Sequence, residues 1–72
     1  MTTHTIGLKI KEARNEKGMS RASLVLALHD AGRRISTETI KNWEMGRTEP
    51  QARDIERLCG VLDKNVLYFF NQ

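Results

Sequence analysis

Hydrophobic residues recur every three or four positions along this 72-residue chain, which is the spacing of amphipathic helices. Polar caps and glycines divide the pattern into five short segments. No stretch alternates between apolar and polar residues, and no Asn-Gly or Asp-Gly turn joins two apolar runs, so strand signals are absent. The sequence therefore predicts a single all-α domain of five helices over residues 1–72.

The first three predicted helices each begin at a hydroxyl residue and end at a glycine. The expected N-caps are Thr5, Ser20 and Ser36, and the expected stops are Gly18, Gly32 and Gly46. The apolar positions that share an inward face are Ile6, Ile10 and Ala13 in the first helix, Leu24, Val25 and Leu28 in the second, and Ile40 and Trp43 in the third.

Two further helices are expected in the second half of the chain. Pro50 suits the first turn of a fourth helix, whose apolar stripe is Ile55, Leu58, Val61 and Leu62. Asn65 can cap a short last helix over 66–71. That helix carries too many apolar residues to bury in its own core, so we predict that 66–72 is a dimerisation segment using Leu67, Tyr68, Phe69 and Phe70. We expect residues 1–4 to lack fixed structure.

Residue composition disfavours catalysis and metal binding. Cys59 is the only cysteine, which excludes an intrachain disulfide and every zinc-finger spacing. His4 and His29 have no second ligand at metal spacing, so we expect no metal and no cofactor. Paired carboxylates near a histidine and phosphate-binding glycine loops are missing, which argues against an enzyme. Because no apolar run approaches the roughly 20 residues of a membrane span and no signal peptide is recognisable, we expect a cytoplasmic, nucleoid-associated protein without a membrane partner.

Basic charge is concentrated in the first half of the chain. The formal net charge is +3, made of +4 over residues 1–35 and −1 over residues 36–72. A positive front half suits contact with phosphates, although a soluble basic face would look the same.

The third predicted helix has the polar outer face that base reading requires. With Ile40 and Trp43 turned inward, the outward residues are Thr37, Glu38, Lys41 and Asn42, with Thr39 at the edge. Ser20 and Arg21 begin the preceding helix, where amides and a cation can meet a phosphate. Glu38 has two interpretations: an acceptor for a cytosine amino group, or an acid favoured by the first turn of a helix.

These features resemble the Cro/CI-type helix-turn-helix family of phage and bacterial regulators. The resemblance covers nearly the whole chain and rests on Ile6-Gly7, Ile10, Arg14, Gly18-Met19-Ser20, Leu24, Leu28, Ile35-Ser36, Ile40, Trp43-Glu44, Gly46-Arg47 and Pro50, including the string W-E-x-G-R-x-x-P. It implies a lambda-repressor-like domain that binds double-stranded DNA, usually as a homodimer on two-fold-related operator half-sites and mainly as a repressor. It also implies an internal ion pair between Arg14 and Glu44, which we expect to orient the third helix with only the small stabilisation of a surface pair.

The chain departs from the family between its second and third helices. The family usually has a single glycine-like turn residue there, whereas this chain has His29-Asp30-Ala31-Gly32-Arg33-Arg34, about five residues more. The lengthened turn is expected to bring Arg33 and Arg34 near a phosphate. The residues expected at the DNA backbone are Ser20, Arg21, Arg33, Arg34, Ser36, Arg47 and Thr48.

A protein-interaction module with the same fold, such as an antitoxin or an adaptor, is the alternative to a DNA-binding regulator. The two differ in their response to salt, because DNA affinity falls with a log–log slope of about −0.9 per phosphate neutralised. An apolar protein–protein contact responds little.

Overall fold

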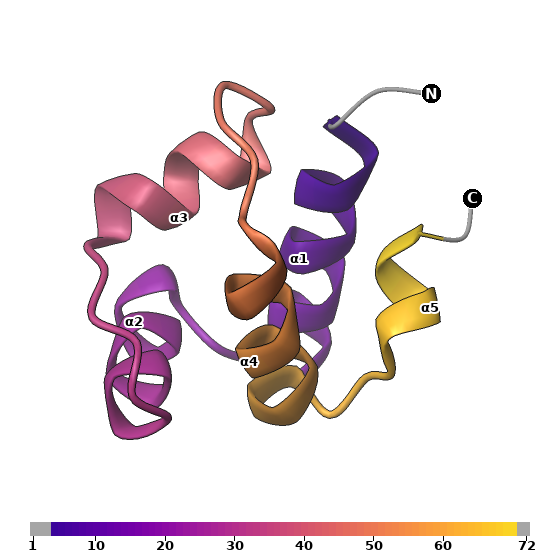
Figure 1. The fold of residues 1–72 in the computed structure, drawn as a ribbon. Coiled ribbons are helices and arrows are strands. Elements are labelled where there is room, and N and C mark those ends of the chain that lie inside the picture. The colour runs from indigo at the N-terminus through magenta and orange to yellow at the C-terminus, as the bar shows by residue number, and fades with distance from the viewer. Residues whose placement is uncertain (1–3, 71–72) are drawn as a thin grey trace.

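A computed structural model of the chain describes residues 4–70, and all five elements in this range are helices. They are α1 (His4–Glu16), α2 (Arg21–Asp30), α3 (Thr37–Glu44), α4 (Ala52–Leu62) and α5 (Val66–Phe70) (Figure 1). The prediction of an all-α five-helix domain is confirmed. The expectation of missing structure in 1–4 lies outside the described residues except at His4, which belongs to α1.

The helices enclose one apolar core. Figure 1 shows α2 and α3 at one side of the domain and α5 at the other, with α1 and α4 between them. Each helix contributes at least one buried side chain to this core, and the buried apolar residues are Ile10, Ala13, Leu24, Leu28, Ile40, Trp43, Ile55, Leu58, Leu62 and Phe69.

Most of the predicted helix ends are observed. The Ser20 and Ser36 hydroxyls accept hydrogen bonds from the backbone N–H groups of Ser23 and Thr39, at 3.0 and 3.2 Å, which satisfies amides that the first turn leaves free. The Asn65 side chain accepts one from the Leu67 N–H at 2.8 Å and caps α5. All three glycine stops have the positive φ that favours glycine.

Two predicted helix starts are wrong. Thr5 is not an N-cap, because α1 already begins at His4. Pro50 lies one residue before the N-cap of α4, which is Gln51. The Gln51 N–H donates to the Asp54 carboxylate at 2.9 Å, so an acid at the third helical position starts this helix.

Gly7 brings α1 and α3 into backbone contact. A Cβ atom built at this position would overlap the carbonyl oxygen of Trp43, which is closer than two non-bonded heavy atoms can approach. Only glycine therefore fits where α1 crosses the end of α3. This close crossing explains a helix-weakening residue inside α1 and limits how far apart α1 and α3 can lie.

Candidate nucleic-acid interface

The polar residues of α3 lie on its exposed side. Thr37, Glu38 and Lys41 are exposed, whereas Thr39 and Asn42 are half-buried at the edges of this face. On the opposite side Ile40 and Trp43 are buried, as the sequence predicted. One side of α3 is thus anchored and the other is free to meet a partner.

Glu44 ends α3, and its buried carboxylate binds two arginines. Arg14 of α1 donates from Nε and Nη2 to the two Glu44 carboxylate oxygens at 2.8 and 3.1 Å, and from Nη1 to the Met19 carbonyl at 2.9 Å. The Arg14 and Glu44 side chains are only 9% and 1% exposed. The structure brings the expected pair together, but our treatment of it as a surface pair was wrong, because both charges are buried.

Arg21 is the second arginine on Glu44 and was expected to face only DNA. Its Nε donates to Glu44 Oε1 at 3.1 Å, while 37% of its side chain stays exposed. Arg21 stands at the first turn of α2, so it joins the start of α2 to the end of α3. Sequence reasoning missed this contact because the partners are 23 positions apart.

Arg33 reaches across to α4, and only 26% of its side chain stays exposed. Its Nε donates to Asp54 Oδ1, and the Asp54 carboxylate is 97% buried while it also caps the Gln51 N–H. We therefore remove Arg33 from the expected phosphate ligands, since its guanidinium is engaged in the domain. The acid three residues after Gln51 is a recognisable capping signal in the sequence, but its ion pair across the fold is not.

Further contacts hold the α2–α3 connection, residues 31–36, against the domain. The Arg57 Nε of α4 donates to the Ala31 carbonyl at 3.1 Å. The His29 Nε2 lies 3.1 Å from the Ile35 carbonyl and closes the connection on itself. The lengthened turn is therefore a supported segment.

The remaining cations near α3 have no acidic partner within residues 4–70. Arg34 and Arg47 are exposed and form no ion pair among the described residues. Thr48 is also exposed, next to Arg47 in the turn that follows α3. Two backbone amides of this turn, those of Arg47 and Thr48, donate to the Asn42 carbonyl at 2.9 and 3.4 Å, so the turn is fixed to the end of α3.

The arrangement of α2 and α3, in which the second helix exposes a polar face, also occurs in a known protein family. The helix-turn-helix family model, that of the Cro/CI type, matches residues 10–69. The chain belongs to this family. Comparisons with curated proteins and with solved structures give no match. As a Cro/CI-type helix-turn-helix domain the chain is a DNA-binding domain and not an enzyme, with α2 and α3 as its two motif helices.

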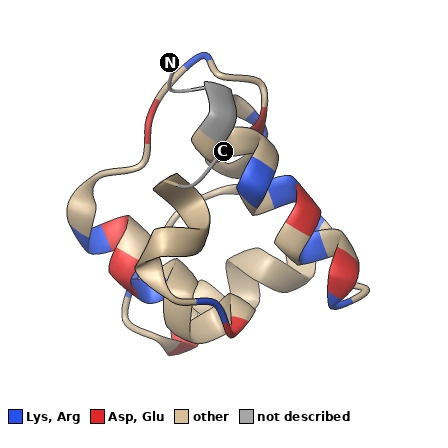
Figure 2. Ribbon diagram, turned by 90° about the vertical axis from the view of Figure 1, so that its right-hand side faces the viewer, with Lys and Arg blue, Asp and Glu red and all other residues tan. Residues whose placement is uncertain are grey.

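The helix α5 carries no charged residue in this helix-turn-helix domain. Figure 2 shows α5 without charged residues, flanked by the charged bands of α1 and α4. Val66, Leu67 and Phe70 are exposed, with Leu67 at 60%. Beside them lies a surface hollow of about 400 Å³ lined by Ala52, Ile55, Glu56, Cys59, Val66 and Phe70.

Two of the four residues expected at a dimer interface make contacts inside the domain instead. Phe69 is fully buried in the core. Tyr68 is half-buried, and its hydroxyl donates to Glu12. The ammonium groups of Lys9 and Lys64 lie 5.0 and 4.7 Å from the centre of its ring. The expectation that Phe69 forms an interface is wrong, because α5 must insert one aromatic ring to hold its place against α1.

Three side chains at this end have shifted pKa values. Burial, and then the Glu12 carboxylate that accepts its hydrogen bond, raise the pKa of the Tyr68 hydroxyl. The same hydrogen bond, followed by the charge of Lys9, lowers the pKa of Glu12. Burial raises the pKa of the Cys59 thiol. Both residues of the Tyr68–Glu12 contact therefore keep the protonation states that hold α5 on α1 near neutral pH.

None of the helices within residues 4–70 is long and apolar enough to cross a membrane. Within the same range no group of histidine, cysteine and acidic residues is arranged to hold a metal ion.

Proposed function

We propose that this domain is a transcriptional regulator, a repressor of phage or bacterial origin, that binds specific double-stranded DNA by placing α3 in the major groove. The observation that carries this proposal is the division of α3 into two sides. Its inner side is held by the core and by the Glu44 ion pair. Its outer side carries Thr37, Glu38 and Lys41, which make no side-chain hydrogen bond or ion pair within residues 4–70. A helix fixed in this way reaches base edges at low entropic cost.

Each outward side chain suits a different base edge. Asn42 can pair bidentately with adenine, Lys41 can donate to guanine, and Glu38 can accept from the cytosine amino group. Thr37 can pack its methyl group on thymine, with Thr39 at the edge of the same face. In this arrangement the Glu38 carboxylate would be repelled by the DNA phosphates. We favour the base-reading interpretation of Glu38, because a cytosine amino group would compensate that repulsion.

A second set of residues is proposed to meet the DNA backbone. Phosphate contacts position a protein on the duplex without distinguishing bases. The proposed contacts come from the first turns of the two motif helices and from the loops beside α3, and the residues are Ser20, Arg21, Arg34, Ser36, Arg47 and Thr48. Arg21 would contact a phosphate through the exposed part of its side chain, whose guanidinium is already held by Glu44.

The test compares base-reading and backbone variants on two duplexes. A binding sequence is selected from random duplexes, and each variant is titrated against it and against a scrambled duplex at two salt concentrations. Glu38→Ala and Asn42→Ala should each lose about 1–3 kcal/mol of preference at one position per half-site. Arg47→Ala, the matched control, should weaken binding to both duplexes and reduce the salt slope by about one. Equal losses on both duplexes for Glu38→Ala and Asn42→Ala would show that α3 does not read the bases.

We also propose that the domain binds DNA as a two-fold dimer through α5. Two-fold operators require recognition helices roughly 34 Å apart. The helix α5 carries no charged residue and exposes Leu67 and Phe70, which suits an isologous contact. In sedimentation experiments Leu67→Glu and Phe70→Glu should weaken self-association without unfolding the domain. Phe69→Ala should instead unfold it or cost about 3–5 kcal/mol, because this ring is in the core. A domain that remains monomeric on its selected DNA would contradict the dimer.

A further inference from the structure

The α2–α3 connection, residues 31–36, carries two arginines with different surroundings. Arg33 is neutralised by the buried Asp54 carboxylate, which is also occupied by the Gln51 N–H. Arg34, the next residue, is exposed and has no hydrogen bond or ion pair among the described residues. The connection therefore turns one cation inward as an anchor and presents the other to solvent.

The support under Arg34 limits where its side chain can reach. The connection is tied to α4 by Arg33 and by the Arg57 hydrogen bond to the Ala31 carbonyl. On its other side, Ser36 caps α3 directly after Ile35, whose carbonyl is held by His29. A cation two residues before the cap of a recognition helix stays beside the end of that helix that enters the groove.

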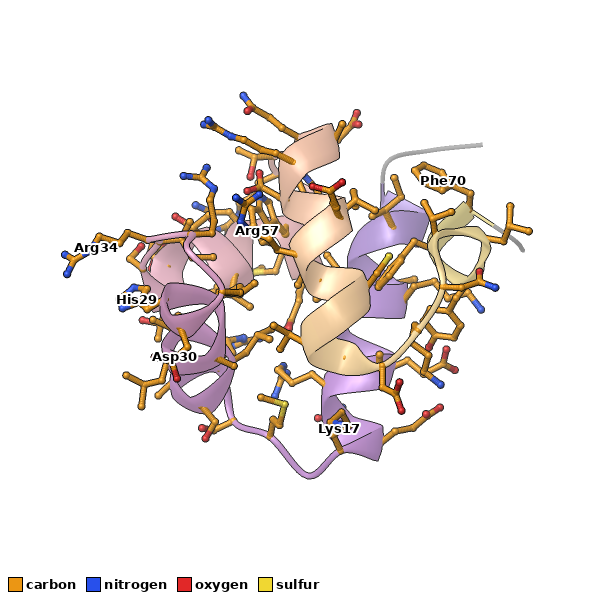
Figure 3. The ribbon with its side chains drawn as sticks, turned by 60° about the horizontal axis from the view of Figure 1, so that its bottom comes forward. Lys17, His29, Asp30, Arg34, Arg57 and Phe70 are labelled. Atoms are coloured by element: carbon orange, nitrogen blue, oxygen red, sulfur yellow. The ribbon has the colours of Figure 1, made fainter. Side chains whose placement is uncertain are left out.

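Arg34 and the exposed face of α5 lie at opposite ends of the domain. Figure 3 shows the Arg34 side chain pointing away from the body at the α2–α3 end, with Phe70 at the far end beyond α4 and α1. Figure 1 gives the same order of helices. In a dimer joined through α5, the connection therefore lies at the end of each protomer that is farther from the two-fold axis.

We propose that Arg34 contacts a DNA phosphate outside the half-site, beyond the outermost base pair that α3 reads. This inference rests on the proposed function and on the α5 dimer. The lengthened connection would extend the contact with DNA outward, because each protomer would add one arginine that binds a phosphate beyond its half-site. The group that Arg34 binds is a phosphate oxygen of the same duplex that α3 reads. Its flanking position makes affinity depend on the length of the duplex and not on the sequence of the flank.

Duplex length is the variable that separates this contact from the others. The long duplex carries several base pairs beyond the last position at which a base change alters affinity, and the short duplex ends at that position. Wild type, Arg34→Ala and Arg47→Ala are titrated against both at several salt concentrations. Arg34→Lys, which keeps the charge, should retain most of the wild-type affinity on the long duplex.

Arg34→Ala should bind the long duplex more weakly than wild type, with a salt slope reduced by about one, and should match wild type on the short duplex. Arg47→Ala should bind both duplexes more weakly than wild type, and by the same factor. The inference is overturned if Arg34→Ala loses the same factor on both duplexes, or loses nothing on either. If the wild-type domain shows no sequence preference at all, the proposed function is refuted, and the inference about Arg34 is refuted with it.

Discussion

Replacing Glu44 by alanine should destabilise this domain more than any surface substitution. The change removes the carboxylate that accepts two hydrogen bonds from Arg14, whose side chain is 9% exposed. After the change Arg14 keeps only its bond to the Met19 carbonyl. A guanidinium is then left in the interior without a counter-charge.

The expected loss is about 3–5 kcal/mol, the usual cost of removing one partner of a buried ion pair. A domain of this length has a total stability on the order of 4–11 kcal/mol at the usual 0.05–0.15 kcal/mol per residue. Because each kcal/mol lowers the melting temperature of a small domain by about 4–8 °C, the midpoint should fall by roughly 12–40 °C.

Urea titration followed by fluorescence provides the measurement, because Trp43 is the only tryptophan and lies buried beside Glu44 in α3. Arg21→Ala is the matched control: it removes the other cation on the same carboxylate, but one that is 37% exposed. It should cost no more than about 1 kcal/mol.

A double variant tests the cause of the loss. Arg14→Met combined with Glu44→Leu replaces both buried charges by apolar side chains and should recover most of the stability. If Glu44→Ala loses less than about 1 kcal/mol, or if the double variant is no more stable than the single one, an uncompensated buried charge is not the reason.

Three further substitutions or reactions have expected outcomes of their own. Gly7→Ala should lower the free energy of unfolding by about 1–3 kcal/mol in the same urea assay, because the new Cβ meets the Trp43 carbonyl. This loss is expected despite the better helix propensity of alanine, and an unchanged midpoint would contradict the close crossing. Asp63→Gly should raise the melting temperature, with a gain of up to about 1 kcal/mol, since Asp63 has a φ of 59°; a decrease would mean that the side chain has a task. Cys59 should react with iodoacetamide more slowly than an unfolded control at pH 8, because burial raises its thiol pKa and lowers the thiolate fraction; equal rates would refute this.

Local signals predicted the helices and the inner face of α3. Ser20, Ser36 and Asn65 act as caps in the structure because each interacts with an amide two or three residues away. Ile40 and Trp43 were assigned to the core because three positions separate them on one helix, and both are buried.

Contacts across the fold were beyond sequence reasoning. Arg33 resembled a free phosphate ligand until the fold placed Asp54 beside it, 21 positions away. Phe69 could not be distinguished from Phe70, because a five-residue helix with apolar residues throughout has no polar side to identify its inner face. Only the position of α5 against α1 decides which ring is buried.

The outer face of α3 has a consequence for how such domains diverge. Thr37, Glu38 and Lys41 are exposed and make no side-chain hydrogen bond or ion pair within residues 4–70. Exchanging them should change the free energy of unfolding by no more than about 0.5 kcal/mol each. The three positions can thus be randomised together as a small library on an unchanged scaffold, and new operator preferences can be sought without repairing the fold after each round.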